Sequence, residues 1–126
     1  MSHDEVLTEL HALRDRITGV TETAVASVDG LLVTADTDGA RPEVLAALSA
    51  ATLGLGKRTG SEMGMGELRE VVIRCATGYV VVYAIRRSGL LVVLADEGLD
   101  VMRLHVESRP TVERLGLLLD GVPADY

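Results

Sequence analysis

The sequence contains no Phe, no Trp and only three Tyr among 126 residues. Single-stranded nucleic acids are held largely by stacking of bases on aromatic side chains, so this shortage of rings argues against such a partner. The net charge of −7, from 12 basic and 19 acidic side chains, argues in the same direction because a phosphate backbone attracts positively charged domains. We therefore expect no nucleic-acid partner.

Cysteine is almost absent too, since Cys75 is the only one. One cysteine excludes a disulfide framework, a CxxC redox pair and a cysteine-rich zinc site within one chain. No apolar run reaches the roughly 18 residues that a membrane-spanning helix needs, and the first ten residues lack the apolar segment of a signal peptide. These features predict a cytoplasmic protein with no membrane span.

What the sequence does contain is a series of short periodic segments, 48% hydrophobic overall, in a length that suits one domain with one core. In chain order, the patterns predict a helix over 2–18, strands over 23–28 and 31–35, a helix over 43–59, strands over 67–75, 79–86 and 90–95, and a helical region over 101–119.

Spacing and turn residues support these elements. Val6, Leu10, Leu13 and Ile17 recur at helical steps and should form one buried face. The pair Asp29-Gly30 between two β-like runs indicates a tight hairpin, because both residue types tolerate positive φ.

The later strands differ from one another. The runs 80–85 and 90–95 are continuously apolar, which is typical of strands buried on both faces. The strand over 67–75 opens with polar residues, which indicates an edge strand. Pro110 predicts that the last helical region is either kinked near Val106 or split, with the firmer part over 110–119.

The second predicted helix is rich in small residues. Ala46, Ala50 and Gly54 recur every four positions, and Ala47 and Ala51 do the same. Such a surface lets another backbone approach closely. The partner is either the protein's own sheet or a helix of a second subunit, and the sequence leaves both open.

Signatures of catalysis and cofactor binding are missing. The glycines around Lys57 match neither the Walker A spacing nor GxGxxG, and no GxSxG elbow occurs. The remaining residues that could carry chemistry have simpler explanations. We expect the three histidines, His3, His11 and His105, to be solvated on the surface. The acidic residues Asp96, Glu97 and Asp100 should lie in a solvated loop, and Cys75 should be inert packing. We expect a non-enzymatic protein with no catalytic, cofactor-binding or metal-binding residues.

Charge is unevenly distributed along the chain. Residues 57–87 hold six basic and three acidic side chains, whereas the segments on either side are acidic. The cationic residues of this block are Lys57, Arg58, Arg69, Arg74, Arg86 and Arg87. They either decorate strand ends or form a steering surface for an acidic partner or a second subunit.

The order of elements, the hairpin Val28-Asp29-Gly30-Leu31-Leu32-Val33 and the strand 90–95 before the last helix resemble the Roadblock family of dynein light chains and bacterial GTPase regulators. The resemblance covers about residues 5–119 of a single domain, 1–126. The Arg- and Ala-rich composition is similar to that of actinobacterial members.

This resemblance implies an α+β, profilin-like three-layer α/β/α sandwich, with five strands in the order 2-1-5-4-3, the second helix on one face and the first and last helices on the other. It also implies a homodimer that pairs its edge strands and packs its second helices together. Gliding-protein relatives bind a small Ras-like GTPase and stimulate its hydrolysis without inserting a catalytic residue.

By this resemblance we expect a regulator or adaptor of a small Ras-like GTPase. Its dimer contact should include Leu48, Ala51, Leu55, Val71 and Ile73, and Arg58 and Arg69 should lie near the partner surface. The alternatives are a passive scaffold for a sensor kinase or motor-type complex and a small-ligand sensor.

Overall fold

The protein is described by a computed structural model that covers residues 2–121. Its elements are α1 (Ser2–Arg16), β1 (Val20–Ser27), β2 (Leu32–Asp36), α2 (Pro42–Glu62), β3 (Glu70–Cys75), β4 (Gly78–Ile85), β5 (Gly89–Asp96) and α3 (Val101–Gly121). All eight predicted elements are present, with bounds shifted by a few residues.

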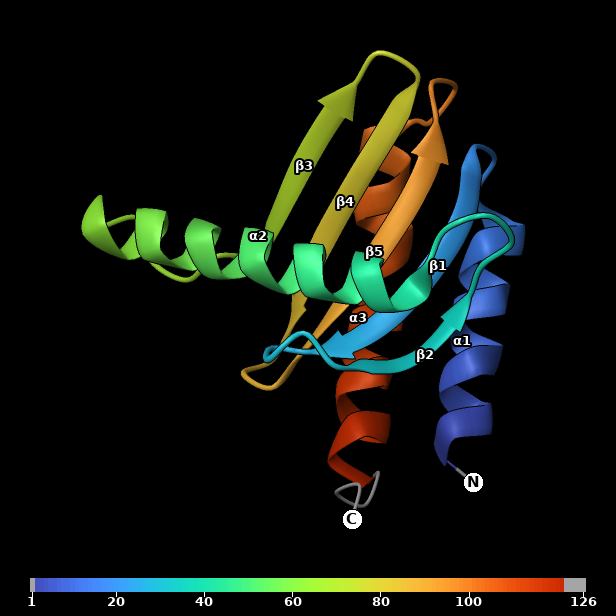
Figure 1. Ribbon diagram of the computed structural model, residues 1–126, viewed down its shortest axis with the longest axis horizontal. Helices are drawn as coiled ribbons and strands as arrows, with labels where there is room; N and C mark the ends of the chain where they lie inside the picture. The colour runs from blue at the N-terminus through green and yellow to red at the C-terminus, as the bar shows by residue number, and fades with distance from the viewer. Residues whose placement is uncertain (1, 122–126) are drawn as a thin grey trace.

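The five strands form one antiparallel sheet in the order β2-β1-β5-β4-β3. Figure 1 shows α2 lying across one face of this sheet, with α1 and α3 side by side on the other. The predicted three-layer α+β architecture and its strand order are therefore confirmed. β3 is the edge strand, as its polar opening residues indicated.

Two apolar layers form the core, one on each face of the sheet. Along β5, Leu91 and Val93 pack in the layer shared with α1 and α3, whereas Leu90 and Val92 pack beneath α2. All four are fully buried, which confirms that this strand is covered on both faces. Burial of each such side chain contributes about 1.5–3 kcal/mol to folding.

The predicted apolar stripe of α1 is buried as expected. Val6, Leu10, Leu13 and Ile17 are at most 1% exposed. The helix ends at Arg16, two residues before the predicted end, and Gly19 then takes φ +98° to turn the chain into β1. Only glycine adopts that backbone conformation without strain.

The first hairpin differs from the predicted two-residue turn. Ser27 N–H donates to the Leu31 carbonyl at 2.9 Å, so the loop contains three residues, Val28, Asp29 and Gly30. Gly30 has φ +87° whereas Asp29 does not have positive φ. A three-residue loop with glycine in the left-handed position is the next commonest hairpin connection. Further along β1, the pairing with β2 changes register between Val25 and Ala26.

Small residues allow α2 to lie close to the sheet. A side chain at Gly56 would place its Cβ only 2.9 Å from Leu68 and 3.0 Å from Val71. Ala46 is fully buried against the sheet and Ala50 packs beside it, whereas Ala51 is exposed on the opposite side of the helix. The small-residue pattern thus explains close packing within the subunit and also leaves an outward face.

The last helix is continuous through Pro110, so of the two predicted alternatives the split was wrong, and a kink near Val106 stays a prediction. Burial on both sides of the proline holds the helix together: Leu104, Ser108, Thr111 and Leu115 are fully buried. This packing offsets the roughly 3 kcal/mol that an internal proline costs a helix.

Within residues 2–121, no helix is both long and apolar enough to cross a membrane.

Candidate interaction surfaces

The first candidate surface is the outward side of α2 together with the free edge of β3, which we call the α2/β3 surface. Leu48 and Leu55 on α2 are 63% and 70% exposed, and Ala51 between them is exposed as well. An interface is indicated when exposed aliphatic side chains gather in one patch, as they do along this side of α2, rather than by the exposure of any one of them.

β3 contributes to the same side of the sheet. Val71 pairs with Val82 and Ile73 with Val80, and both partners pack beneath α2. Residues directly opposite in a ladder point to the same face, so Val71 and Ile73 also point to the α2 side. Ile73 is 36% exposed, whereas Val71 is half-buried beside Gly56.

The position of α2 leaves these residues uncovered. In Figure 1 the C-terminal part of α2 extends beyond β3, past the edge of the sheet. β3 ends the strand order, so one side of its backbone has no strand partner within residues 2–121. The structure brings the five predicted dimer residues to one side of the molecule. It contains one chain, so their role in a dimer stays a prediction.

Of the two predicted partner-surface residues, Arg58 lies two turns after Ala51 and one turn after Leu55, so it continues their side of α2. Arg58, on the extending part of α2, is exposed and lies 3.5 Å from Glu62 one turn further on. Arg69 precedes β3, and its carbonyl accepts a hydrogen bond from Ala84 N–H at 3.2 Å. Arg69 also lines a broad groove, whereas Arg58 does not.

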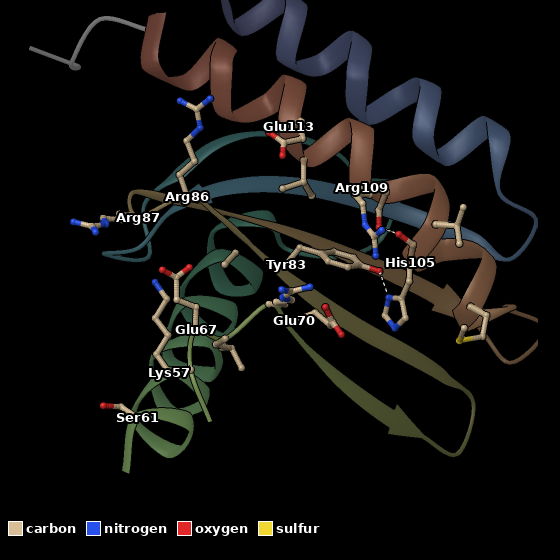
Figure 2. A pocket seen from close by; sticks show the side chains of 18 of the residues that line it. Lys57, Ser61, Glu67, Glu70, Tyr83, Arg86, Arg87, His105, Arg109 and Glu113 are labelled. Atoms are coloured by element: carbon tan, nitrogen blue, oxygen red, sulfur yellow. Dashed lines mark hydrogen bonds between the residues drawn. The ribbon is translucent and has the colours of Figure 1, made fainter. Parts of the chain in front are cut away.

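This groove has a volume of about 1330 Å³ and is the second candidate surface. It opens between α3, the β4–β5 turn and the end of α2, beside the start of β3 (Figure 2). We call it the basic groove, because it carries more cationic than acidic side chains in a chain whose net charge is −7. The cationic ones are Lys57, Arg69, Arg86, Arg87 and Arg109, and the acidic ones are Glu67, Glu70 and Glu113.

Arg86 is held in place against α3. It has φ +51°, the only positive φ outside glycine in residues 2–121, and its guanidinium pairs with Asp120. The side chain passes over Gly116, where a Cβ would come within 2.8 Å of Arg86 Nε. A left-handed conformation costs a non-glycine residue about 1–2 kcal/mol, and the ion pair and the packing on Gly116 help to offset that cost.

Tyr83 and His105 meet at the floor of the groove. The Tyr83 hydroxyl lies 2.7 Å from His105 Nδ1, and the two rings meet edge to face. Burial raises the pKa of Tyr83 to about 12, and the nearby Glu70 carboxylate adds to this rise. The hydroxyl therefore keeps its proton at physiological pH, and the pair fixes α3 against β4.

Comparison with known proteins identifies the fold. The sequence profile of the Roadblock/LC7 domain matches residues 6–95, which is most of the chain. The chain belongs to the Roadblock/LC7 domain family. The predicted family is confirmed.

Relatives of this Roadblock/LC7 domain are found in archaea and bacteria. The protein MJ1340 of Methanocaldococcus jannaschii is 27% identical over 113 residues, covering 89% of this chain and 95% of the relative. MJ0310 of the same organism is 26% identical and covers the same fractions of this chain and of the relative. Because these curated relatives are archaeal, they do not support the actinobacterial branch, which stays a prediction.

Solved structures have the same architecture. A Roadblock/LC7 domain from Streptomyces avermitilis superposes with a TM-score of 0.84 at 25% identity, covering 90% of this chain and 96% of the other. The gliding protein MglB from Thermus thermophilus gives a TM-score of 0.84 at 16% identity, covering 97% and 93%. At that identity the likeness to MglB concerns the fold.

Two expectations about single residues were wrong for this Roadblock/LC7 domain. Cys75 is exposed at the end of β3 rather than packed, because the edge strand has nothing over its last residue. His105 is half-buried on Tyr83 rather than solvated. His3 and His11 are exposed as expected, although His11 also contacts Asp36 at 3.0 Å.

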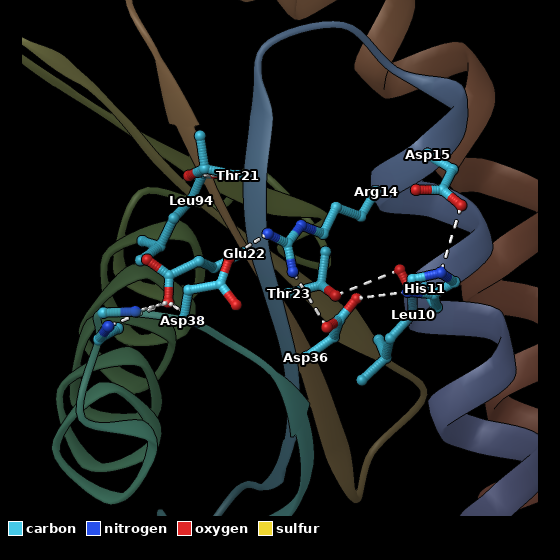
Figure 3. Close-up of polar contacts among 12 residues, drawn as sticks. Leu10, His11, Arg14, Asp15, Thr21, Glu22, Thr23, Asp36, Asp38 and Leu94 are labelled. Atoms are coloured by element: carbon cyan, nitrogen blue, oxygen red, sulfur yellow. Dashed lines mark hydrogen bonds and ion pairs between the residues drawn. The ribbon is translucent and has the colours of Figure 1, made fainter.

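Sequence reasoning missed a polar cluster that fixes the β2–α2 loop (Figure 3). Arg14 of α1 reaches Asp36 at 3.0 Å and Asp38 at 2.5 Å. Both carboxylates help to raise the pKa of Arg14, the hydrogen bond to Asp38 contributing most. Glu22 Oε1 accepts hydrogen bonds from the backbone N–H groups of residues 38, 39 and 40 at 3.0–3.3 Å. No spacing rule links residues this far apart, so only the tertiary fold reveals the cluster.

The described residues contain no group of three His, Cys, Asp or Glu side chains that could hold a metal ion.

Proposed function

We propose that this Roadblock/LC7 domain is a non-enzymatic, cytoplasmic regulator or adaptor of a small Ras-like GTPase, and that it acts as a homodimer. The observation that carries the proposal is the α2/β3 surface, where Leu48 and Leu55 are exposed and the edge of β3 has no strand partner within residues 2–121. An edge strand without a partner invites pairing with another chain. The family's gliding-protein branch provides the GTPase as the expected partner.

A dimer gives the free edge of β3 a strand partner and covers the exposed side chains of α2. Pairing two β3 edges would continue the sheet through the two-fold axis, and the extending part of α2 would then lie over the second subunit. An interface of this kind is isologous, with the same patch on both subunits. The five predicted contact residues, Leu48, Ala51, Leu55, Val71 and Ile73, would all become buried.

The test is GTP hydrolysis by the Ras-like GTPase encoded nearest to this gene, measured in single turnover with and without the purified protein. A regulator changes the rate of hydrolysis or of nucleotide exchange. The test variant is Leu55→Asp, which should separate the subunits and so remove the effect on the GTPase. The control is Leu31→Asp, because Leu31 is equally exposed, at 69%, but lies in the β1–β2 loop.

Complex formation without any change in hydrolysis or exchange would favour the passive scaffold, in which the dimer assembles a sensor kinase or motor-type complex. Absence of a complex with the GTPase would contradict the proposal. The small-ligand alternative predicts that a metabolite raises the melting temperature, because a ligand that binds only the native state stabilises it.

A further inference from the structure

We propose that the basic groove binds an acidic, amphipathic segment of a partner protein. The inference goes beyond the proposed GTPase role, because it concerns a different surface and can be tested with this chain and a peptide alone.

The charge of the groove supports an acidic partner. Arg87 of the β4–β5 turn and Arg109 of α3 both line the groove (Figure 2). Arg69, which precedes β3, lines it as well, so the three cations come from three different segments. Among the ion pairs formed within residues 2–121, none involves these three arginines. Unpaired cations in an otherwise acidic chain raise the association rate of an acidic segment and restrict its orientation.

Apolar side chains in the groove favour a protein segment. Met102 and Val106 lie one turn apart on α3 and are 71% and 66% exposed. They give the α3 wall of the groove an apolar strip. A segment with apolar residues on one side and carboxylates on the other would cover the strip and reach the arginines.

A nucleotide or a free phosphate fits the groove less well. The Tyr83 ring at its floor is only 6% exposed, so no aromatic face is open for a base to stack on. Glu67, Glu70 and Glu113 alternate with the cations and would repel a compact polyanion. Carboxylates spaced along a polypeptide can approach the arginines while avoiding these three residues.

The groove and the α2/β3 surface adjoin at Lys57 of α2 and Glu70 of β3, but the opposite wall of the groove belongs to α3 alone. Met102, Val106 and Arg109 belong to α3, on the face of the sheet opposite α2. Leu48 and Leu55 point outward from α2. A subunit engaged through the α2/β3 surface therefore keeps the α3 wall of the groove accessible.

The experiment is a titration of the intact protein, labelled at its methionine methyl groups, followed by NMR. The probes are synthetic peptides of about four helical turns, one with Leu on one face and Glu elsewhere, one with the same composition in permuted order, and one with Lys in place of Glu. Met102 reports on the groove, and Met63 and Met65, which do not line it, serve as reference signals.

We expect the amphipathic Glu peptide to shift the Met102 methyl signal with saturation. Arg87→Glu and Arg109→Glu should each weaken its binding about two- to fivefold, the range of exposed ion pairs, and more in combination. Val106→Asp should abolish the saturable shift. Arg41→Glu changes an exposed arginine at the start of α2 and should leave the affinity unchanged.

The proposal is overturned if the permuted or Lys peptide binds as tightly as the amphipathic Glu peptide, or if Arg41→Glu weakens binding as much as Arg109→Glu. It is also overturned if sodium phosphate or anionic phosphatidylserine vesicles alone shift Met102 to the same extent, since the groove would then be a general anion site. Amide spectra of each variant distinguish lost binding from lost folding.

Discussion

At the scale of single residues, two glycines have opposite surroundings. A Cβ at Gly78, at the start of β4, would overlap the carbonyl oxygen of Ala95 in the neighbouring strand. A Cβ at Gly54, within α2, would meet nothing within 4 Å. The first glycine is required by close backbone approach, whereas the second only weakens its helix.

Gly78→Ala should therefore lower the free energy of unfolding by about 2 kcal/mol, because β4 and β5 must separate to admit the methyl group. Gly54→Ala should raise it by about 0.5–1 kcal/mol through better helix propensity and a less flexible unfolded chain. Urea unfolding at one protein concentration measures both. Equal effects of the two substitutions would contradict this assignment.

Tyr83 makes stability depend on pH in the alkaline range. Its pKa is about 12 in the folded protein and 10.0 as the reference value. Between these values the unfolded chain loses the proton more readily than the folded one. The contribution of the protonated Tyr83 hydroxyl to stability is therefore fully present below pH 10 and is lost as the pH rises toward 12.

Over this pH range, we expect the free energy of unfolding of the wild-type protein to fall by about 2 kcal/mol more than that of the Tyr83→Phe variant. At neutral pH the Phe variant should be about 1 kcal/mol less stable, because His105 loses its hydroxyl partner. Urea unfolding of both proteins from pH 8 to 12 compares them. Parallel pH profiles would show that the Tyr83 hydroxyl is not buried in solution.

At the scale of elements, the loop between β2 and α2 depends on one side chain from β1. Glu22 satisfies three consecutive backbone N–H groups in that loop. The loop sets where α2 begins, so the carboxylate influences how the helix crosses the sheet.

Glu22→Ala should lower the free energy of unfolding by about 2 kcal/mol, because three N–H groups lose a charged acceptor. Glu22→Gln keeps an oxygen in place and should cost about half as much. Glu62→Ala, at an exposed position of α2, is the control and should stay within about 0.5 kcal/mol of wild type. Thermal unfolding measures the change in stability, and hydrogen exchange measures the protection of the amides of residues 38–40. Unchanged amide protection in Glu22→Ala would contradict the role of Glu22 in holding the loop.

At the scale of the whole molecule, the uncovered side of α2 determines what the fold can do. One subunit buries its two apolar layers completely and still leaves Leu48 and Leu55 in water. A second copy of the same surface is the partner that the geometry favours.

We expect the wild-type protein to be a dimer at micromolar concentration by light scattering and Leu55→Asp to be a monomer. The melting temperature of Leu55→Asp extrapolated to low concentration should match that of wild type, because Leu55 is 70% exposed within its own subunit. Leu31→Asp should remain dimeric. A monomeric wild type would remove the dimer from the proposed function.

Much of this fold could be predicted from local patterns. The α1 stripe, the doubly apolar β5 and the polar opening of β3 each follow from side-chain period and burial, which act over a few residues. The continuity of α3 through Pro110 could not be predicted, because it depends on buried Leu104 and Leu115 contacting elements far away in the chain. The loop length of the first hairpin likewise depended on strand register.

The two candidate surfaces also differ in how far the sequence could predict them. Leu48 and Leu55 could be named for a dimer contact only through the family resemblance, and the structure then places both in water. The basic groove could not be located, because Arg109 lies outside the cationic block of residues 57–87 and joins Arg69 and Arg86 only when α3 packs beside β4.

The sequence by itself determined the family, the order of elements and the shortage of aromatic residues, since each is a property of composition or local period. Only the tertiary structure decided which cations share a groove, which histidine is half-buried and which side of α2 stays in water. The physical reason is that charge pairing, burial and exposure depend on contacts between residues far apart in the chain. Local patterns specify the elements, and their packing creates the surfaces.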